Sequence, residues 1–177
     1  ALALVVLSPL LAVIAAAVKL SSRGPVFYRQ ERCGLNGRPF HMLKFRSMPV
    51  GSESQTGPVW AQKGDSRPTR LGAFLRKTSM DELPQFWNVL KGEMSFVGPR
   101  PERPGIVDEL AQSVPFYQYR HMVKPGITGW AQISYPYGAS IEDEYQKLKF
   151  DLYYIKNYSL VLDFLILIQT IRVVLWP

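Results

Sequence analysis

The sequence is poor in the residues that build disulfide frameworks and zinc sites. It contains one cysteine, Cys33, and two histidines, so no internal disulfide can form and a zinc centre is not expected. A single thiol fits a reducing compartment. Acidic residues are also in deficit, with 14 Asp and Glu against 21 Lys and Arg, which gives a formal net charge of +7. A surplus of this sign favours an anionic partner: a nucleic acid, a phosphorylated substrate or an acidic membrane surface.

Several common sequence patterns are absent as well. Neither G-x-x-x-x-G-K-S/T nor G-x-G-x-x-G occurs, so a bound nucleotide would not use either of those phosphate cradles. No basic run with interleaved aromatic residues is present, and no nucleic-acid partner is expected. The chain has no internal repeat and no low-complexity tract. Its 177 residues, 47% of them hydrophobic, predict one domain with a substantial core.

One long hydrophobic run opens the chain. Residues 1–18 carry no charge, and as a helix they would reach ~27 Å, just short of a bilayer core. Cations follow the run at Lys19 and Arg23, unlike in a signal peptide, and favour a cytoplasmic exit. Pro9 lies in the middle and predicts a kink or a break. Composition alone favours a kinked spanning helix over a re-entrant helix or a buried helix of a soluble domain.

The rest of the chain predicts a helix-rich α+β fold. A β-hairpin is expected where two β-forming stretches, 26–32 and 39–48, flank the turn residues Gly34–Gly37. Residues 49–69 are expected to form a long loop. Helices are expected over residues 71–77, 83–90, 106–123 with a break at Pro115, 140–157 and 159–176. The last of these is strongly apolar, and its pattern fits a core helix and an interfacial helix equally.

Two adjacent acids, Asp81 and Glu82, stand just before the helix expected at 83–90. Ser79-x-x-Glu82 has the spacing of a capping box, which is one purely structural interpretation of the pair. Alternatively Pro84 is the first helical residue, and the two acids stand just ahead of the helix. Adjacent residues of a helix point in different directions, so the two carboxylates could not share one proton. They could divide labour: one would hold a divalent cation, and the other would attack or accept a proton.

Cations surround the acidic pair in the sequence. Lys44 and Arg46 alternate along the second hairpin strand, so both would point to one face. Arg76 lies shortly before the pair, and Arg100 and Arg103 follow within rigid Gly-Pro segments. Because guanidinium groups bind phosphate oxygens two at a time, these five cations predict a pyrophosphate pocket better than scattered surface charge.

These motifs together resemble a known family, the bacterial sugar transferases that transfer hexose 1-phosphates to a polyprenyl phosphate. The matching stretches are residues 22–30 (SRGPVFYRQ), 44–48 (KFRSM), 75–95 (LRKTSMDELPQFWNVLKGEMS), 98–101 (GPRP), 124–132 (KPGITGWAQ) and 151–154 (DLYY). Residues 135–140 (YPYGAS) resemble the exopolysaccharide branch, many members of which carry further N-terminal membrane helices and another domain. With Ala1 at its start, the chain is expected to be the C-terminal catalytic part of a longer protein.

The resemblance implies a reaction. Such enzymes move a sugar 1-phosphate from a UDP-sugar to undecaprenyl phosphate and so initiate exopolysaccharide or glycan assembly. By this resemblance Asp81 attacks the phosphorus bound to the sugar, releases UMP and forms a phosphosugar-aspartyl intermediate. Glu82 is implied to bind Mg²⁺ at the pyrophosphate. Arginines such as Arg76 and Arg100 would neutralise charge on the phosphate oxygens.

The resemblance also replaces the kinked span by a re-entrant helix. Residues 1–19 would be broken at Ser8-Pro9, with both ends cytoplasmic, and residues 20–177 would form the catalytic domain. Ser8 is then expected to hydrogen-bond a backbone group that Pro9 frees. The implied location is the cytoplasmic face of the bacterial inner membrane, where a UDP-sugar meets a polyprenyl phosphate; a homodimer is compatible with it.

Two rival functions stay open. A metal-dependent glycosyltransferase would move the sugar alone and release UDP. Its usual acid-x-acid motif has one poor match, Glu142-Asp143-Glu144, which looks like a helix start. A membrane-tethered scaffold or nucleic-acid module is supported by net charge alone and would not need Asp81. The sugar is not determined, because glucose, galactose and N-acetyl sugars are all compatible with the sequence.

Overall fold

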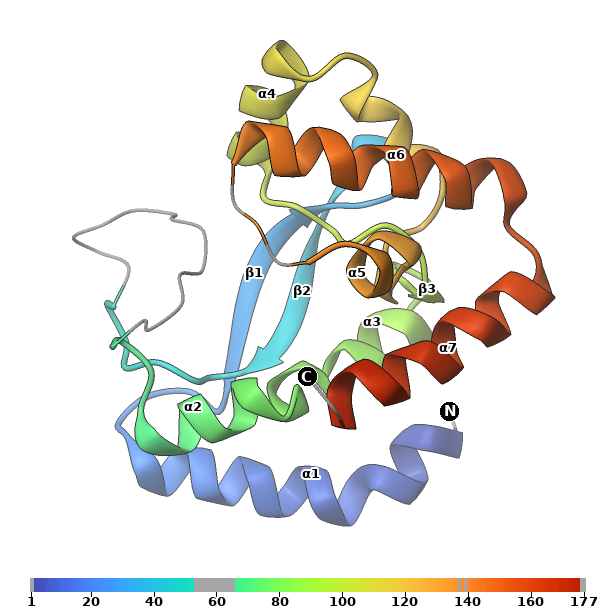
Figure 1. Ribbon diagram of the computed structural model, residues 1–177. Helices are drawn as coiled ribbons and strands as arrows, with labels where there is room; N and C mark the ends of the chain where they lie inside the picture. The colour runs from blue at the N-terminus through green and yellow to red at the C-terminus, as the bar shows by residue number, and fades with distance from the viewer. Residues whose placement is uncertain (1, 53–65, 137, 139, 176–177) are drawn as a thin grey trace. The chain divides into compact units, whose positions relative to one another are not determined.

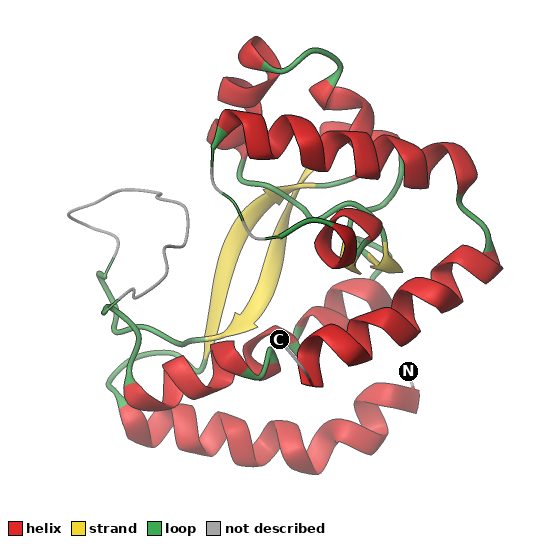
Figure 2. Cartoon of the chain, viewed as in Figure 1, coloured by secondary structure: helices red, strands yellow, loops and turns green. Residues whose placement is uncertain are grey.

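The computed structural model describes residues 2–52, 66–136, 138 and 140–175 (Figures 1 and 2). The chain divides into two compact units, and neither is a continuous stretch of sequence. The first unit comprises Ala1–Arg29 and Leu43–Trp87, and the second comprises Gln30–Met42 and Asn88–Pro177. The observed α+β, helix-rich architecture agrees with the expected fold class.

The first unit is built on helices α1 (Leu2–Ser21) and α2 (Arg70–Lys77), which lie along one another (Figure 1). Thr69 caps α2: its hydroxyl accepts a hydrogen bond from the Gly72 amide at 2.9 Å, which satisfies one of the unpaired donors of the first turn. The core between the elements of this unit contains Ile14, Val18, Phe45 and Leu75. The expected loop at 49–69 lies mostly outside the described residues, since 53–65 are not described.

Helix α1 continues without interruption through the expected break at Ser8-Pro9. Pro9 has no amide proton to offer the carbonyl of Val5, four residues earlier. The Ser8 hydroxyl donates to that carbonyl at 2.7 Å, which is the contact expected from the sequence. This substitute hydrogen bond explains why the proline is tolerated inside the helix rather than ending it. The stretch Leu4–Ser21 is long and apolar enough to cross a membrane, and 11% of it is buried.

The predicted hairpin is present as β1 (Phe27–Cys33) and β2 (Pro39–Phe45), joined through the short 3-10 helix η1 (Leu35–Gly37). Asn36 and Gly37 have φ of 54° and 72°, as a primed hairpin turn requires, so this prediction is confirmed. Both strands have residues in each unit, because the unit boundaries fall at Arg29/Gln30 and Met42/Leu43.

The second unit contains a sheet that the sequence did not predict. Strands β3 (Ser95–Val97) and β4 (Gly126–Thr128) pair in parallel, with Ser95 opposite Gly126 and Val97 opposite Thr128. Glycine makes the close approach possible: a Cβ on Gly126 would lie 2.2 Å from the Gly98 amide nitrogen. Each strand has only three residues.

The second unit also contains helices, the last of which contacts both strands of this small sheet (Figure 1). They are α4 (Pro104–Ser113), η3 (Tyr117–Met122), α5 (Trp130–Ser134), α6 (Ile141–Asn157) and α7 (Leu160–Leu175). The expected break at Pro115 is confirmed between α4 and η3, and Phe116 there has a φ of 65°. Ser140 and Asp143 form a capping box at the start of α6, which confirms that Glu142-Asp143-Glu144 begin a helix.

Helix α7 is apolar on both of its sides. Ile166 is fully buried, and the Thr170 hydroxyl hydrogen-bonds that of Thr128 in β4 at 2.7 Å, so one side packs on the sheet. The other side exposes large apolar residues: Leu160, Val161, Phe164, Leu165, Ile168, Ile171 and Val173. Soluble surfaces rarely show an apolar area of this extent.

Candidate active site

The acidic pair lies in a tight turn that follows α2. This turn is η2 (Met80–Glu82), and α3 (Gln85–Leu90) begins three residues after it. The expected capping box is wrong: Ser79 is left-handed, with φ 55° and ψ 13°, and its side chain makes no capping hydrogen bond. An N-cap residue needs extended backbone for its hydroxyl to reach the third amide. The capping box of Ser79 and Glu82 is therefore not formed.

The two carboxylates have different surroundings. Asp81 is buried, with 6% of its surface exposed. The Glu82 carboxylate accepts a hydrogen bond from the Lys44 ammonium group at 2.7 Å, and both side chains are largely buried. Lys44 comes from β2, so a long-range contact brings one of the predicted cations to the acidic pair. Partly buried charge-assisted hydrogen bonds of this kind are stronger than exposed ion pairs.

Arg46 lies two residues after Lys44 in the sequence, but its side chain is directed to the C-terminal end of α1. One terminal nitrogen, Nη2, donates to the carbonyl oxygens of Val18 at 3.3 Å and Ser22 at 2.6 Å. These contacts suit the C-terminal end of a helix, where carbonyl groups lack partners and the dipole favours a cation. Arg46 is 6% exposed, and its predicted role in phosphate binding stays a prediction.

Ser47 and Arg76 link the same strand end to α2. Arg76 donates through Nε to the Ser47 hydroxyl at 2.8 Å, and the Ser47 carbonyl accepts from the Thr69 amide at 3.0 Å. Arg76 is nevertheless exposed, so part of this cation stays accessible. The residues that follow β2 thus connect α1 and α2 within the first unit.

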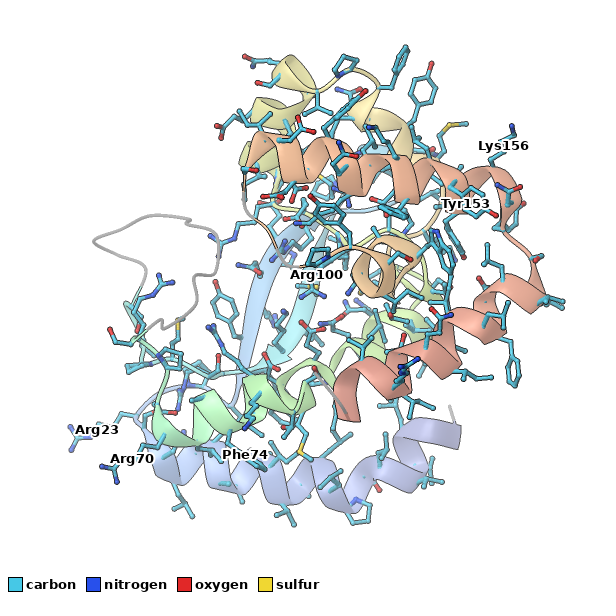
Figure 3. All side chains as sticks on the ribbon, viewed as in Figure 1. Arg23, Arg70, Phe74, Arg100, Tyr153 and Lys156 are labelled. Carbon is cyan, nitrogen blue, oxygen red and sulfur yellow. The ribbon has the colours of Figure 1, made fainter. Side chains whose placement is uncertain are left out.

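Arg100 and Arg103, the other two predicted phosphate ligands, belong to the second unit. Arg103 precedes α4 as its N-terminal flanking residue, with Pro104 in the first helical position. Arg100 lies between Pro99 and Pro101, and its side chain is partly exposed (Figure 3). Proline fixes φ on each side of Arg100, which limits the backbone motion of this segment.

Arg120 and Asp151 form a buried ion pair behind this segment, and sequence reasoning missed both as functional residues. Arg120 Nη2 lies 2.9 Å from an Asp151 carboxylate oxygen, and the side chains are 6% and 2% exposed. Burial raises the pKa of Asp151 to about 6, while the Arg120 charge opposes that rise. Asp151 belongs to the DLYY motif, but the motif by itself does not indicate that this aspartate pairs with Arg120.

The donor set around Asp81 and Glu82 fits magnesium better than zinc. Within the described residues, no three His, Cys, Asp or Glu side chains group together as a metal site. Mg²⁺ needs no such cage, because it usually keeps several waters and binds one or two carboxylates together with substrate phosphates. A carboxylate already held by a lysine can supply one such ligand. Glu144, from the rival acid-x-acid motif, is instead paired with Lys147 at 2.8 Å.

Comparisons with known proteins agree with the family that the motifs resemble. The sequence profile described as "Bacterial sugar transferase" matches residues 1–177. The chain is 51% identical over 174 residues to a protein of Aeromonas hydrophila named UDP-N-acetylgalactosamine-undecaprenyl-phosphate N-acetylgalactosaminephosphotransferase. It is 49% identical to a UDP-glucose:undecaprenyl-phosphate glucose-1-phosphate transferase of Xanthomonas campestris pv. campestris and 48% identical to one of Escherichia coli (strain K12).

The alignments cover almost all of this chain and less than half of each relative. They include 98%, 96% and 96% of the chain, but 41%, 35% and 37% of the three relatives in the same order. The similarity therefore lies in one part of longer proteins. One of the three names gives N-acetylgalactosamine and two give glucose, so identity near 50% does not distinguish these donors.

Proposed function

Because the chain belongs to the bacterial sugar transferase family, we propose that it transfers a sugar 1-phosphate from a UDP-sugar to undecaprenyl phosphate. The names of relatives near 50% identity over almost the whole chain support this assignment. One structural observation carries the proposed chemistry: Asp81 is buried, and the carboxylate of the adjacent Glu82 accepts a hydrogen bond from Lys44 at 2.7 Å. By the same assignment, the lipid-linked product would initiate exopolysaccharide or glycan assembly.

In the proposed reaction Asp81 is the nucleophile. A carboxylate oxygen of Asp81 attacks the phosphorus that carries the sugar, the bond from that phosphorus to the bridging oxygen breaks, and UMP leaves. An oxygen of undecaprenyl phosphate then attacks the same phosphorus and releases the Asp81 carboxylate. Two half-reactions allow a soluble nucleotide and a lipid to use the same carboxylate in turn.

Side chains near Asp81 are proposed to neutralise the negative charge of the donor's phosphates. We propose Glu82 as the protein ligand for Mg²⁺, which when bound would neutralise charge on the pyrophosphate. Lys44 orients the Glu82 carboxylate by donating a hydrogen bond to it at 2.7 Å. Arg76, with its exposed guanidinium, and Arg100 are proposed to bind donor phosphate oxygens, because paired N–H groups match them well.

We further propose that the protein works at the cytoplasmic face of the inner membrane. Helix α1 is apolar and mostly unburied, and α7 exposes an apolar side of its own. Arg23 and Arg70 extend outward from the first unit near the end of α1, where anionic headgroups would attract them (Figure 3). A re-entrant path would require the continuous helix α1 to bend at its internal Pro9, and it would return the cations after α1 to the cytoplasmic side.

The identity of the released nucleotide tests the reaction. The protein in nanodiscs, supplied with Mg²⁺ and undecaprenyl phosphate, is incubated with UDP-glucose, UDP-galactose and their N-acetyl derivatives. We expect UMP with one donor. Release of UDP instead would assign a glycosyltransferase and remove Asp81 from the nucleophile role.

A single substitution tests the nucleophile itself. Asp81→Asn is expected to keep the fold and the affinity for UDP-sugar while UMP release falls by at least about a thousandfold, since an amide oxygen is a very weak nucleophile. Asp108→Asn, in the exposed face of α4, is the matched control and should retain full activity. Substantial turnover by Asp81→Asn would show that another group attacks the phosphorus.

A further inference from the structure

The backbone of the segment that carries Arg100 is fixed by many hydrogen bonds. Four consecutive carbonyl oxygens, from Pro99 to Glu102, each accept a hydrogen bond from a different donor of the second unit. The Gly126 amide donates to Pro99 O at 2.9 Å and the Cys33 amide to Glu102 O at 2.8 Å. Side chains take the two carbonyls between them.

Those two side chains are arginines from distant parts of the sequence. Arg120 Nη2 donates to the Arg100 carbonyl at 3.0 Å, and Arg32 Nη1 donates to the Pro101 carbonyl at 2.8 Å. Arg32 also pairs with the Glu102 carboxylate at 3.0 Å, which keeps this second arginine in place. Because the prolines already restrict φ, fixing these carbonyls leaves little freedom for the backbone at Arg100.

Using Arg120 to bind a carbonyl group carries a desolvation cost, because the guanidinium charge is buried. A buried guanidinium must be paired, and here Asp151 of α6 lies 2.9 Å from Nη2 while Nη1 donates to the Tyr117 hydroxyl. A neutral side chain could donate one hydrogen bond without burying two charges. An arginine, however, has several donors in one rigid plane, so it can bind the carboxylate, the hydroxyl and the carbonyl together.

We propose that Arg120 and Asp151 are positioning residues that hold the Arg100 segment in the geometry that binds the donor's phosphates, without touching the donor themselves. This inference rests on the proposed function, in which Arg100 contacts the UDP-sugar. Preorganised arginine donors bind better than mobile ones because the ordering of the segment has already occurred before the ligand arrives. The DLYY motif then has a physical role: its aspartate keeps the positioning arginine charged and oriented.

A double-mutant cycle with UDP as the probe tests the proposal. Affinity is measured by calorimetry on the protein in nanodiscs. Arg100→Ala should weaken UDP binding by about tenfold, and Arg120→Lys, which keeps the charge but loses the planar set of donors, by roughly fivefold. In the Arg100→Ala background, Arg120→Lys should change the affinity less than about twofold, because it acts through Arg100. Lys149→Arg, an exposed cation exchange on α6, is the matched control and should leave the affinity unchanged.

A second variant separates positioning from stability. Arg120→Met together with Asp151→Leu removes both buried charges, an exchange that commonly leaves stability intact or improves it. We expect an unchanged or higher Tm, roughly fivefold weaker UDP binding, and faster hydrogen exchange of the amides in residues 98–103. The Lys149→Arg control should change none of these three.

The outcomes distinguish the inference from the function on which it rests. Equal losses caused by Arg120→Lys in the wild-type and Arg100→Ala backgrounds would overturn the positioning role, as would unchanged affinity in the charge-free double variant. If Arg100→Ala itself leaves UDP affinity unchanged, the inference also fails. The transfer reaction is judged separately, by UMP release and its loss in Asp81→Asn.

Discussion

Replacing Gly72 by alanine should destabilise the first unit, although the same exchange normally stabilises a helix. Gly72 lies in the first turn of α2, where alanine is favoured by about 0.5–1 kcal/mol. A Cβ at this position, however, would lie 1.9 Å from the Ser47 carbonyl oxygen and 2.8 Å from its Cα. These are backbone atoms, so they cannot rotate aside, and the helix must move.

The size of the effect follows from these two opposing contributions. Overpacking against a fixed neighbour costs typically about 1–3 kcal/mol, and the short contact here places it at the upper end or beyond. After the helical preference is subtracted, about 2 kcal/mol of net destabilisation remains, or ~4–8 °C in Tm for a chain of this size. Because α2 leads directly into the acidic turn, UMP release should fall as well.

The matched control is Gly105→Ala in the first turn of α4. An added Cβ there meets nothing within 4 Å, so only the helical preference acts and Tm should rise slightly. Thermal unfolding followed by circular dichroism in detergent compares both variants with the parent. A Tm for Gly72→Ala equal to or above the parent's would refute the close packing of α2 on Ser47.

Two further predictions concern pH and the membrane. Burial, with help from the Arg120 charge, lowers the pKa of His121 from 6.5 to about 4; the neutral form is therefore favoured in the folded state, and the associated stability is complete above pH 6.5 and is lost as pH falls toward 4. Between pH 6.5 and 4, His121→Gln should therefore lose about 2 kcal/mol less unfolding free energy than the parent, as measured by urea denaturation. Asp151, whose pKa is raised, contributes to stability in the opposite sense, but it does so equally in both proteins and cancels in the comparison. A fluorophore attached at Phe164→Cys on the exposed side of α7 should be quenched by nitroxide-labelled lipids, whereas the same label at Lys149→Cys on α6 should not; equal quenching at both would contradict an interfacial α7.

The sequence predicted the elements whose signals are local. The hairpin followed from the positive φ that Asn36-Gly37 tolerates, α6 from the acids of its first turn, and the interruption at Pro115 from the missing amide proton of proline. The contact from Ser8 to the Val5 carbonyl was also predictable, because Pro9 determines which carbonyl group is freed. Each of these depends on residues at most a few positions apart.

The predictions were wrong where contacts between residues distant in the sequence determine the local conformation. Ser79-x-x-Glu82 has the spacing of a capping box, but Lys44 from β2 attracts the Glu82 side chain, and Ser79 adopts left-handed backbone. The β3–β4 pair has too few residues for a periodic pattern, and its glycines suggested loops instead of close strand contact. Asp81 and Glu82 could be identified as candidate site residues from sequence, whereas the Arg120–Asp151 pair could not, because nothing local indicates that these side chains meet.

The division into two interleaved units has a consequence for synthesis on the ribosome. Residues Gln30–Met42 leave the exit tunnel early, but they belong to the second unit, most of which is translated after Asn88. The apolar side chains of Phe40 and Met42 pack with Met94, and Cys33 packs with Tyr117 and Leu148, so these partners arrive much later. The tip of the hairpin is therefore made before its core partners, at a time when α1, the helix proposed to enter the membrane, is already complete. Early membrane attachment of α1 would keep this waiting segment away from other nascent chains and reduce the chance of aggregation before the second unit closes.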